Sequence, residues 1–445
     1  MEVMRLHFGC KSCGYSAAVL FLVAPAVAQQ QDTGDTADTA SRGRIADYLF
    51  RTVKLSGSLR LRWESGQGSD FRVTPAPWYV LTRARFGAAF RPLWWLNFAA
   101  EAQDARAIFY RVKPSGSVQD PFDLRQAYLE LGASESTLMA RVGRQELTLG
   151  SGRLIASLDW SNTARLYDVA RARLNTKSAK LDLVAGSIVQ IDPDRVDRHK
   201  PGEHFYAGYL ALPSVLPAGS IEPYAIVKTQ LSVKGKDGVA GGADTYALGG
   251  RIVGAAPRRL DYSLEAVRET GNYANDILQA FGFVSSIGWR IATSNGPRVV
   301  AEYVYSSGDN GRQDRHRETF DNMYGFNQPT NSLTGQFGWR NLTELRVGVE
   351  FRPIPKLKAN LDLRNFAISN VQDGLYNASG SRTVWNPKAT NAHVGFGPDV
   401  QITMAIWKGT SLGVGLGTLF PGEYLRQSGK TTGFLYPSVS VTRKL

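Results

Sequence analysis

Residues 54–64 read KLSGSLRLRWE, and this stretch decides the fold class. Every second residue from Leu55 to Trp63 is apolar or glycine, whereas the residues between them are serine or arginine. Because successive side chains of a strand point to opposite faces, the pattern predicts a β-strand with one apolar and one polar face. Strict alternation over about ten residues is typical of strands that cross a membrane in a closed barrel, with the apolar face outward.

The same period of two returns along the rest of the chain, in about eighteen segments. The connections between them alternate in length. Residues 91–92 and 353–355 are short connections, whereas 308–340 and 370–390 are long ones. Outer-membrane barrels combine short periplasmic turns, long extracellular loops and an even number of strands. We therefore predict an all-β fold, a transmembrane antiparallel β-barrel of about 18 strands over residues 54–445, integral to a Gram-negative-type outer membrane.

The N-terminal residues predict export from the cytoplasm. Residues 1–28 have a basic start, an apolar stretch at 15–24 and the small-residue sequence Ala26-Val27-Ala28, as a signal peptide does. Residues 29–53 form a polar periplasmic lead-in. Cys10 and Cys13 both lie in the signal, so we expect a mature chain without a disulfide, a thiolate metal site or a cysteine nucleophile.

The net charge of +13 fits nucleic acid, an anionic membrane or an anionic cargo. No nucleic-acid-binding motif is recognisable, so we expect no nucleic-acid partner. The arginines are instead scattered through strand-like segments, which favours a lumen lined by basic side chains. Rings of Arg and Lys select anions in pores, and arginine grips a carboxylate with two parallel hydrogen bonds.

Two short motifs and the segment that follows them stand out. They are RQAYLEL at 125–131 and RVGRQEL at 141–147, followed by Gly152-Arg153-Leu154 and Asp159-Trp160. These motifs resemble the alginate-export family of outer-membrane barrels. Weaker matches at 307–309, 319–321, 373–376 and 421–422 extend the resemblance over most of residues 54–445. The sequence departs from the family at Leu149 and Ser151, where an aromatic and an acidic residue are usual, and at the C-terminal Leu445, where an aromatic is usual. The resemblance implies a monomeric pore of eighteen strands whose lumen binds and passes a polyuronate.

Twelve basic residues are our candidates for lining the lumen and binding substrate. Ten of them fall on the predicted polar face of their strands, and two, Arg144 and Arg153, flank the glycine-rich turn of a long loop that we expect to fold inward. Interleaved carboxylates such as Glu130 and Glu344 would keep the binding of cargo weak enough for release. The alternative for each arginine is that it pairs with such a carboxylate and braces the barrel. The twelve are Arg60, Arg62, Arg83, Arg85, Arg141, Arg144, Arg153, Arg346, Arg352, Lys356, Lys358 and Arg364.

The predicted function is therefore an anion-selective channel for an anionic polysaccharide such as alginate. The alternatives are a general or small-anion porin with the same fold, and an adhesin or receptor barrel that acts through residues 308–340. We expect no enzymatic activity, no cofactor and no metal, because neither His199 and His204 nor the loop aspartates fit a known template. Other expected partners are outer-membrane lipid and lipopolysaccharide. A barrel has no energy source, so export would need a periplasmic partner or a gradient.

Overall fold

The structure is a computed structural model that describes residues 52–68, 71, 78–133, 135–292, 296–311, 314–326, 328 and 330–445. The predicted signal peptide, residues 1–28, and nearly all of the predicted lead-in lie outside the described residues. None of the described helices is long and apolar enough to cross a membrane.

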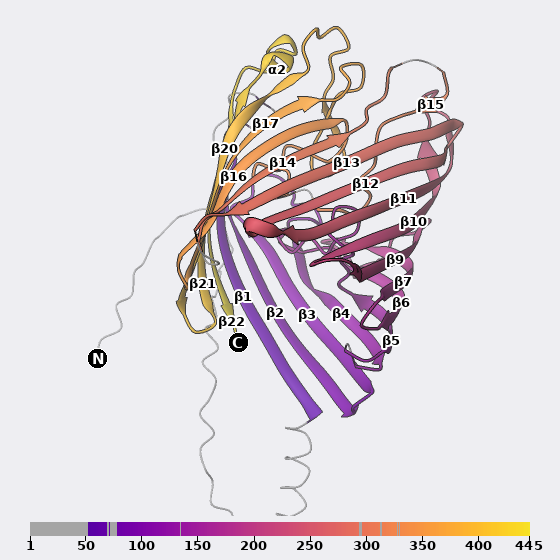
Figure 1. Cartoon of the computed structure of the whole chain (residues 1–445), viewed down its shortest axis with the longest axis vertical. Coiled ribbons are helices and arrows are strands. Elements are labelled where there is room, and N and C mark those ends of the chain that lie inside the picture. Colours follow the sequence, from indigo (N-terminus) through magenta and orange to yellow (C-terminus); the bar gives the residue numbers. More distant parts are fainter. Residues whose placement is uncertain are drawn as a thin grey trace, which may run out of the picture. The chain divides into compact units, whose positions relative to one another are not determined.

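Eighteen long strands form the wall of a barrel (Figure 1). They are β1 (Val53–Ser65), β2 (Trp78–Leu93), β3 (Leu96–Ile108), β4 (Asp120–Leu131), β5 (Leu138–Gln145), β6 (Tyr167–Asn175), β7 (Lys180–Gln190), β9 (Glu203–Leu216), β10 (Gly219–Lys234), β11 (Ala240–Ala256), β12 (Leu260–Tyr273), β13 (Asp276–Arg290), β14 (Arg298–Ser306), β16 (Leu342–Ile354), β17 (Leu357–Ile368), β20 (His393–Trp407), β21 (Thr410–Pro421) and β22 (Phe434–Lys444). The short elements in the connections are β8 (Arg198–His199), η2 (Pro257–Arg259), β15 (His316–Arg317), β18 (Leu375–Tyr376), β19 (Arg382–Val384) and α2 (Glu423–Gln427).

Each long strand pairs antiparallel with the next, and the first pairs with the last. The closing pair, β1 with β22, runs from Ser58 opposite Lys444 to Glu64 opposite Ser438. The sheet therefore has no free edge, which is what lipid requires of a spanning sheet. The closed antiparallel barrel of eighteen strands confirms the prediction.

The connections differ at the two ends of the barrel. Two-residue turns such as 217–218, 355–356 and 408–409 join the strands at one end, which is the periplasmic end in barrels of this class. Most connections at the other end are long. The connection between β12 and β13 is short, since the chain turns between Tyr273 and Asp276 within two residues, and the connection between β21 and β22 contains helix α2, residues 423–427.

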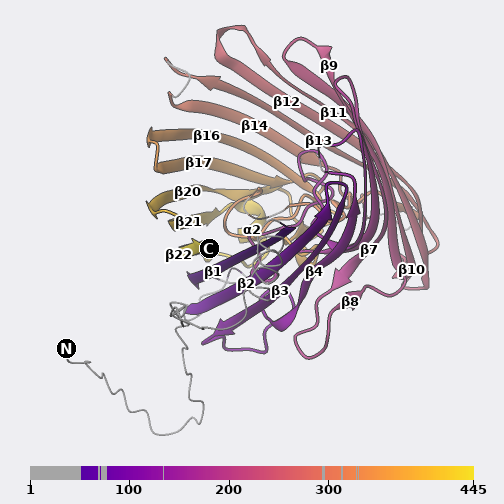
Figure 2. The same ribbon diagram turned by 90° about the horizontal axis from the view of Figure 1, so that it is seen from below.

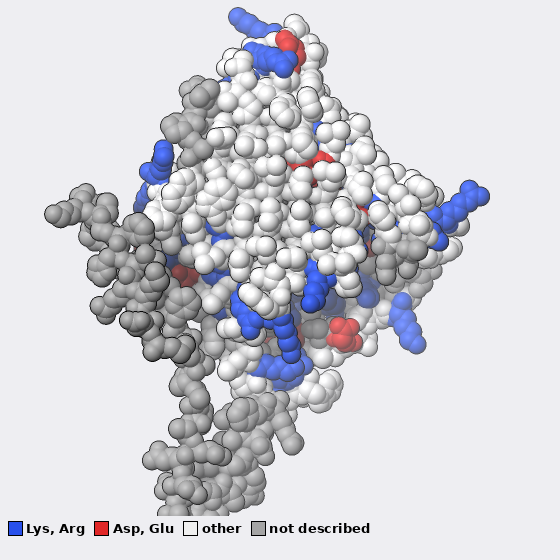
Figure 3. Space-filling model, turned by 90° about the vertical axis from the view of Figure 1, so that its left-hand side faces the viewer, with Lys and Arg blue, Asp and Glu red and all other residues white. Residues whose placement is uncertain are grey.

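The alternation in the sequence separates two faces of the wall. Leu59 and Leu61 of β1 are 53% and 56% exposed, whereas Arg62 beside them is 4% exposed. The apolar side chains thus point away from the barrel and the charged ones into it. Figure 3 shows one outer face, which carries few charged side chains across its middle, as a surface in contact with lipid requires.

Two long connections fold into the lumen. We call residues 146–166, between β5 and β6, the first inner loop, and residues 307–341, between β14 and β16, the second inner loop. The two loops pair with each other: the amide of Ala156 donates to the carbonyl of Tyr324 (3.0 Å), and the amide of Tyr324 donates to the carbonyl of Leu154 (2.9 Å). Figure 2, a view from below, shows loop segments inside the ring of strands.

The hydrophobic core therefore lies inside the barrel. Ile155 and Tyr324 of the inner loops pack in one buried cluster with Phe205 and Tyr224 of the wall. Gly249 faces this cluster, and a Cβ atom there would lie 2.4 Å from the ring of Tyr224. Glycine at position 249 therefore leaves room for this ring against the strand.

Candidate anion pathway in the lumen

Four of the predicted arginines surround the tip of the first inner loop. The inward faces of β1 and β2 supply them, and we call the four the arginine clasp: Arg60, Arg62, Arg83 and Arg85. The carboxylate of Asp159 lies 2.8 Å from Nη2 of Arg85 and 3.0 Å from Nη1 of Arg83. Arg60 donates to the carbonyl of Asp159 (3.0 Å), and Arg62 donates to the carbonyl of Trp160 (2.6 Å).

The clasp holds more positive than negative charge. Its carboxylate partners are Asp159 on the loop and Glu64, which pairs with Arg62. Burial alone would raise the pKa of Asp159, but the guanidinium groups of Arg85 and Arg83 lower it to about 2. Asp159 therefore stays ionised at neutral pH, and its side chain is still 56% exposed. The loop carboxylate occupies an anion site that solvent can reach.

A second aspartate holds the second inner loop in a similar way. Asp321 accepts from Nζ of Lys228 on β10 (2.9 Å) and also pairs with Arg340 at the end of the loop. Burial alone would raise the pKa of Asp321, but the charges of Lys228 and Arg340 hold it well below its usual range. A neighbouring loop carboxylate, Asp309, pairs with Lys236 (2.8 Å). Each of these two loop carboxylates is therefore neutralised by a lysine of the protein itself, Asp321 by Lys228 and Asp309 by Lys236.

The predicted arginines of β5 brace the wall. Arg141 pairs with Glu130 on the adjacent strand. Arg144 pairs with Asp168 at 2.9 Å and donates to the carbonyl oxygens of Leu124 and Asp197, both at 3.1 Å. The guanidinium of Arg144 thus contacts protein groups on three sides. For this residue the structure agrees with the alternative that the arginine braces the barrel.

A row of ion pairs rises along β14, β16, β17 and β20. Arg364, 4% exposed, pairs with Glu344 and lies 3.2 Å from Asp399. Arg346 lies 2.8 Å from Asp362 on the neighbouring strand. A cavity of 250 Å³ opens beside this row. The residues that line it and carry charge are Arg153, Glu302, Arg346, Asp362, Arg364 and Asp399.

A polar cavity of 920 Å³ lies at the short-turn end of β13, β14, β16 and β17. We call it the basic mouth. Its charged lining residues are Arg290, Arg298, Arg352, Lys358 and a single carboxylate, Glu350. Arg298 pairs with Asp261 (2.6 Å) and with Glu350 (3.0 Å). The other three cations form no ion pair with any residue that the structure describes.

The basic mouth adjoins the cavity beside the row of ion pairs, because Asn360 lines both. Arg290 and Arg298 were not among the predicted residues. They face each other across the pairing of β13 and β14, and both flank the short turn at 291–297. The sequence could have identified them, because both lie on the polar face of a strand with alternating polar and apolar residues and both are next to a turn.

One prediction about position is wrong. Lys356 was expected on the polar face of a strand but lies in the turn between β16 and β17, where it is exposed. Pro353 and Pro355 have no amide hydrogen to donate, and the strand pairing becomes irregular between Phe351 and Ile354. β16 nevertheless continues through Pro353 to Ile354, so the turn falls at residues 355–356 and β17 begins at Leu357, one residue after Lys356.

The comparison with known families agrees with the fold. The family described as "Alginate export" matches residues 51–434. The chain belongs to the alginate export family. As a member of this family it is an integral outer-membrane channel and not an enzyme. A search of curated proteins gives no match.

Several solved structures of outer-membrane barrels are similar to this chain in fold, although their sequence identity to it is low. OccK1 (OpdK) of Pseudomonas aeruginosa has a TM-score of 0.61 at 10% identity, over 88% of this chain and 98% of that one. OccK8 (OprE) of the same organism has a TM-score of 0.59 at 12% identity, with the same coverage. OccAB4 of Acinetobacter baumannii has a TM-score of 0.59 at 11% identity, again with the same coverage. At these identities the likeness concerns the fold alone.

Proposed function

We propose that this channel passes an anionic solute, specifically an anionic polysaccharide such as alginate, along the basic side chains of its lumen. The observation that carries the proposal is the basic mouth, where Arg290, Arg352 and Lys358 have no carboxylate partner among the described residues. Fixed cations without counter-charges replace the hydration that a carboxylate loses on entering a narrow pore.

A polymer would meet several anion sites in succession. From the basic mouth, the path leads past Asn360 to Arg346, which shares its carboxylates with neighbouring arginines. The arginine clasp lies on another part of the wall, around Asp159. A chain with a carboxylate on each sugar can hold one site while it leaves another, and this exchange lowers the barrier to movement. We expect the channel to act as a monomer, with a gradient or a periplasmic partner as the source of energy.

A second candidate is a porin for small anions, which is favoured because the two inner loops occupy part of the lumen. The inner loops leave separate cavities of 250 and 470 Å³ in the part of the lumen that they occupy. Small anions fit these cavities as they stand, whereas a polymer needs the first inner loop to move. The release of Asp159 from Arg83 and Arg85 is the movement that we infer for a polymer.

Planar bilayers containing the purified mature chain test the proposal. We expect an anion-selective reversal potential in a KCl gradient and a current that polyuronate blocks in a concentration-dependent way. Neutral dextran of equal length is the matched control and should block far less. Anion selectivity without block by polyuronate would favour the small-anion porin. Cation selectivity would overturn both candidates.

A further inference from the structure

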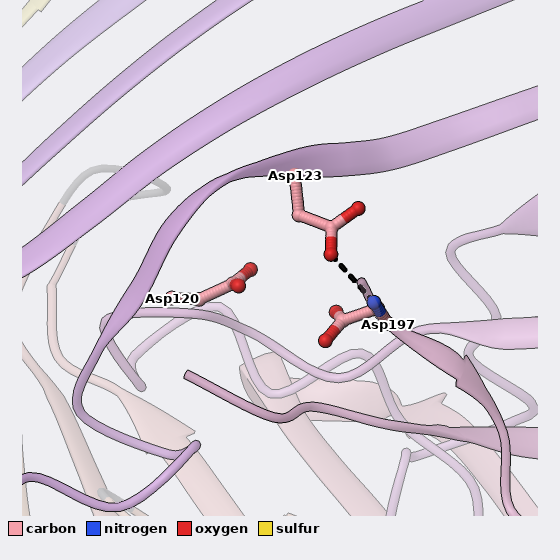
Figure 4. A group of neighbouring side chains, drawn as sticks. All are labelled: Asp120, Asp123 and Asp197. Atoms are coloured by element: carbon pink, nitrogen blue, oxygen red, sulfur yellow. Dashed lines mark hydrogen bonds between the residues drawn. The ribbon is translucent and has the colours of Figure 1, made fainter. Parts of the chain in front are cut away.

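Three carboxylates meet at the outer end of β4. Asp120 and Asp123 belong to this strand, and Asp197 lies in the connection between β7 and β9 (Figure 4). One oxygen of each lies within 4.8 Å of the others. Their exposed fractions are only 4%, 8% and 6%, so this is a buried group of acids and not an exposed acidic patch.

Asp120 is the member of the group whose carboxylate has no hydrogen-bond or ion-pair partner among the described residues. Its carboxylate points toward the other two in Figure 4, and no hydrogen-bond donor or cation among the described residues pairs with it. Asp123 accepts from the amide of Asp197 (2.6 Å), and Asp197 accepts from the amide of Asp192 (3.0 Å). Arg144, on the neighbouring strand, pairs with Asp168 and donates to the backbone carbonyl of Asp197 (3.1 Å), but forms no ion pair with any of the three carboxylates. An ionised carboxylate that is largely buried and has no ion-pair partner is costly, and a bound cation would offset that cost.

We propose that Asp120, Asp123 and Asp197 bind one Ca²⁺ ion. Ca²⁺ takes oxygen ligands at 2.3–2.6 Å, so that two ligands across the ion lie about 5 Å apart. Oxygens within 4.8 Å of one another are close enough to bind one such ion together. Mg²⁺ requires about 2.0–2.1 Å and a near-ideal octahedron, and Zn²⁺ favours nitrogen and sulfur. Three carboxylates would exceed the charge of the ion by one, which suits tight binding.

The ion would close a gap in the wall. The pairing of β4 with β5 ends at Ala127 opposite Arg144, because β5 stops at Gln145. On that side Asp123, in the outer part of β4, contacts Asp197 of the connection 191–202 instead of a strand. A Ca²⁺ ion held by both segments would cross-link them above the ends of β5 and β6.

The test uses mature chain refolded without lipopolysaccharide in detergent, stripped with EDTA and titrated with CaCl₂ by calorimetry. We expect one saturable site that Mg²⁺ at equal concentration does not fill, and a higher temperature for heat-modified migration on a gel. Asp120→Asn and Asp197→Asn should each weaken binding at least tenfold. Asp237→Asn, which removes an exposed loop carboxylate, is the control and should bind as the unchanged chain does.

Three results would overturn the proposal: no binding by the unchanged chain, equal filling by Mg²⁺, or equal binding by Asp120→Asn. Heat-modified migration of each variant reports whether its barrel has closed. If Asp120→Asn does not close, Asp197→Asn, whose residue lies outside the strands, takes its place in the same comparison.

Discussion

Replacing Asp159 by Asn should make the channel bind its cargo more tightly. The substitution keeps the shape of the side chain and removes the charge that competes with cargo for Arg83 and Arg85. The two contacts measure 3.0 and 2.8 Å, but the side chain is 56% exposed, so solvent screens it. Each contact is then worth about 1 kcal/mol, and not the several kcal/mol of a buried pair.

Two such contacts amount to about 2 kcal/mol at most, which corresponds to a roughly 5- to 30-fold change in an equilibrium constant. The assay is the polyuronate concentration that halves the current through the channel in a planar bilayer. We expect this concentration to fall by about that factor in Asp159→Asn. Asp237→Asn removes the same charge from an exposed outer loop and should leave block unchanged. Unchanged or weaker block in Asp159→Asn would refute the idea that this carboxylate stands in for the cargo.

Three other predictions follow from the same geometry. Arg352→Gln combined with Lys358→Gln should move the reversal potential toward zero, because both cations line the basic mouth without an ion pair; an unaltered potential would mean that the mouth does not set selectivity. Arg364→Gln should destabilise the barrel by about 3–5 kcal/mol, since it leaves the carboxylate of Glu344 buried and uncompensated; gel migration after heating measures this, and an unchanged transition temperature would contradict it. The pKa of Asp159, about 2, is below the unfolded value of about 3.9, so its contribution to holding the loop is complete above about pH 4 and is lost as the pH falls toward 2. Conductance should therefore stay constant from pH 7 to pH 4, and a step near pH 5 or 6 would argue against this loop contact.

The wall could be predicted from the sequence because its physics is local. Alternation such as that of Leu59 and Leu61 with Arg60 and Arg62 needs no partner strand to be recognised, and it fixes which face meets lipid. The inward fold of the first inner loop could be anticipated from its length and glycines. Its contact with the wall could not, because Asp159 is 76 residues from Arg83.

The carboxylate group of the proposed calcium site was missed for a similar reason. Asp120 and Asp123 are close in sequence, but Asp197 joins them only because β5 ends early and the connection after β7 covers the gap. No linear template contains that spacing. The error at Lys356 has a different cause: β16 extends to Ile354, so the turn falls at residues 355–356 instead of 353–355, and the next strand begins one residue later than expected.

The choice between bracing and cargo contact depends on how deeply the partner of each arginine is buried. Glu344, the partner of Arg364, is fully buried, so a cargo carboxylate cannot replace it without leaving a charge inside the protein. Asp159 is the opposite case, because its exposed carboxylate can return to water when a cargo carboxylate takes its arginines. The arginines with buried partners therefore hold the barrel together. Those with an exposed partner, or with none, as at Arg352, are left to bind the solute.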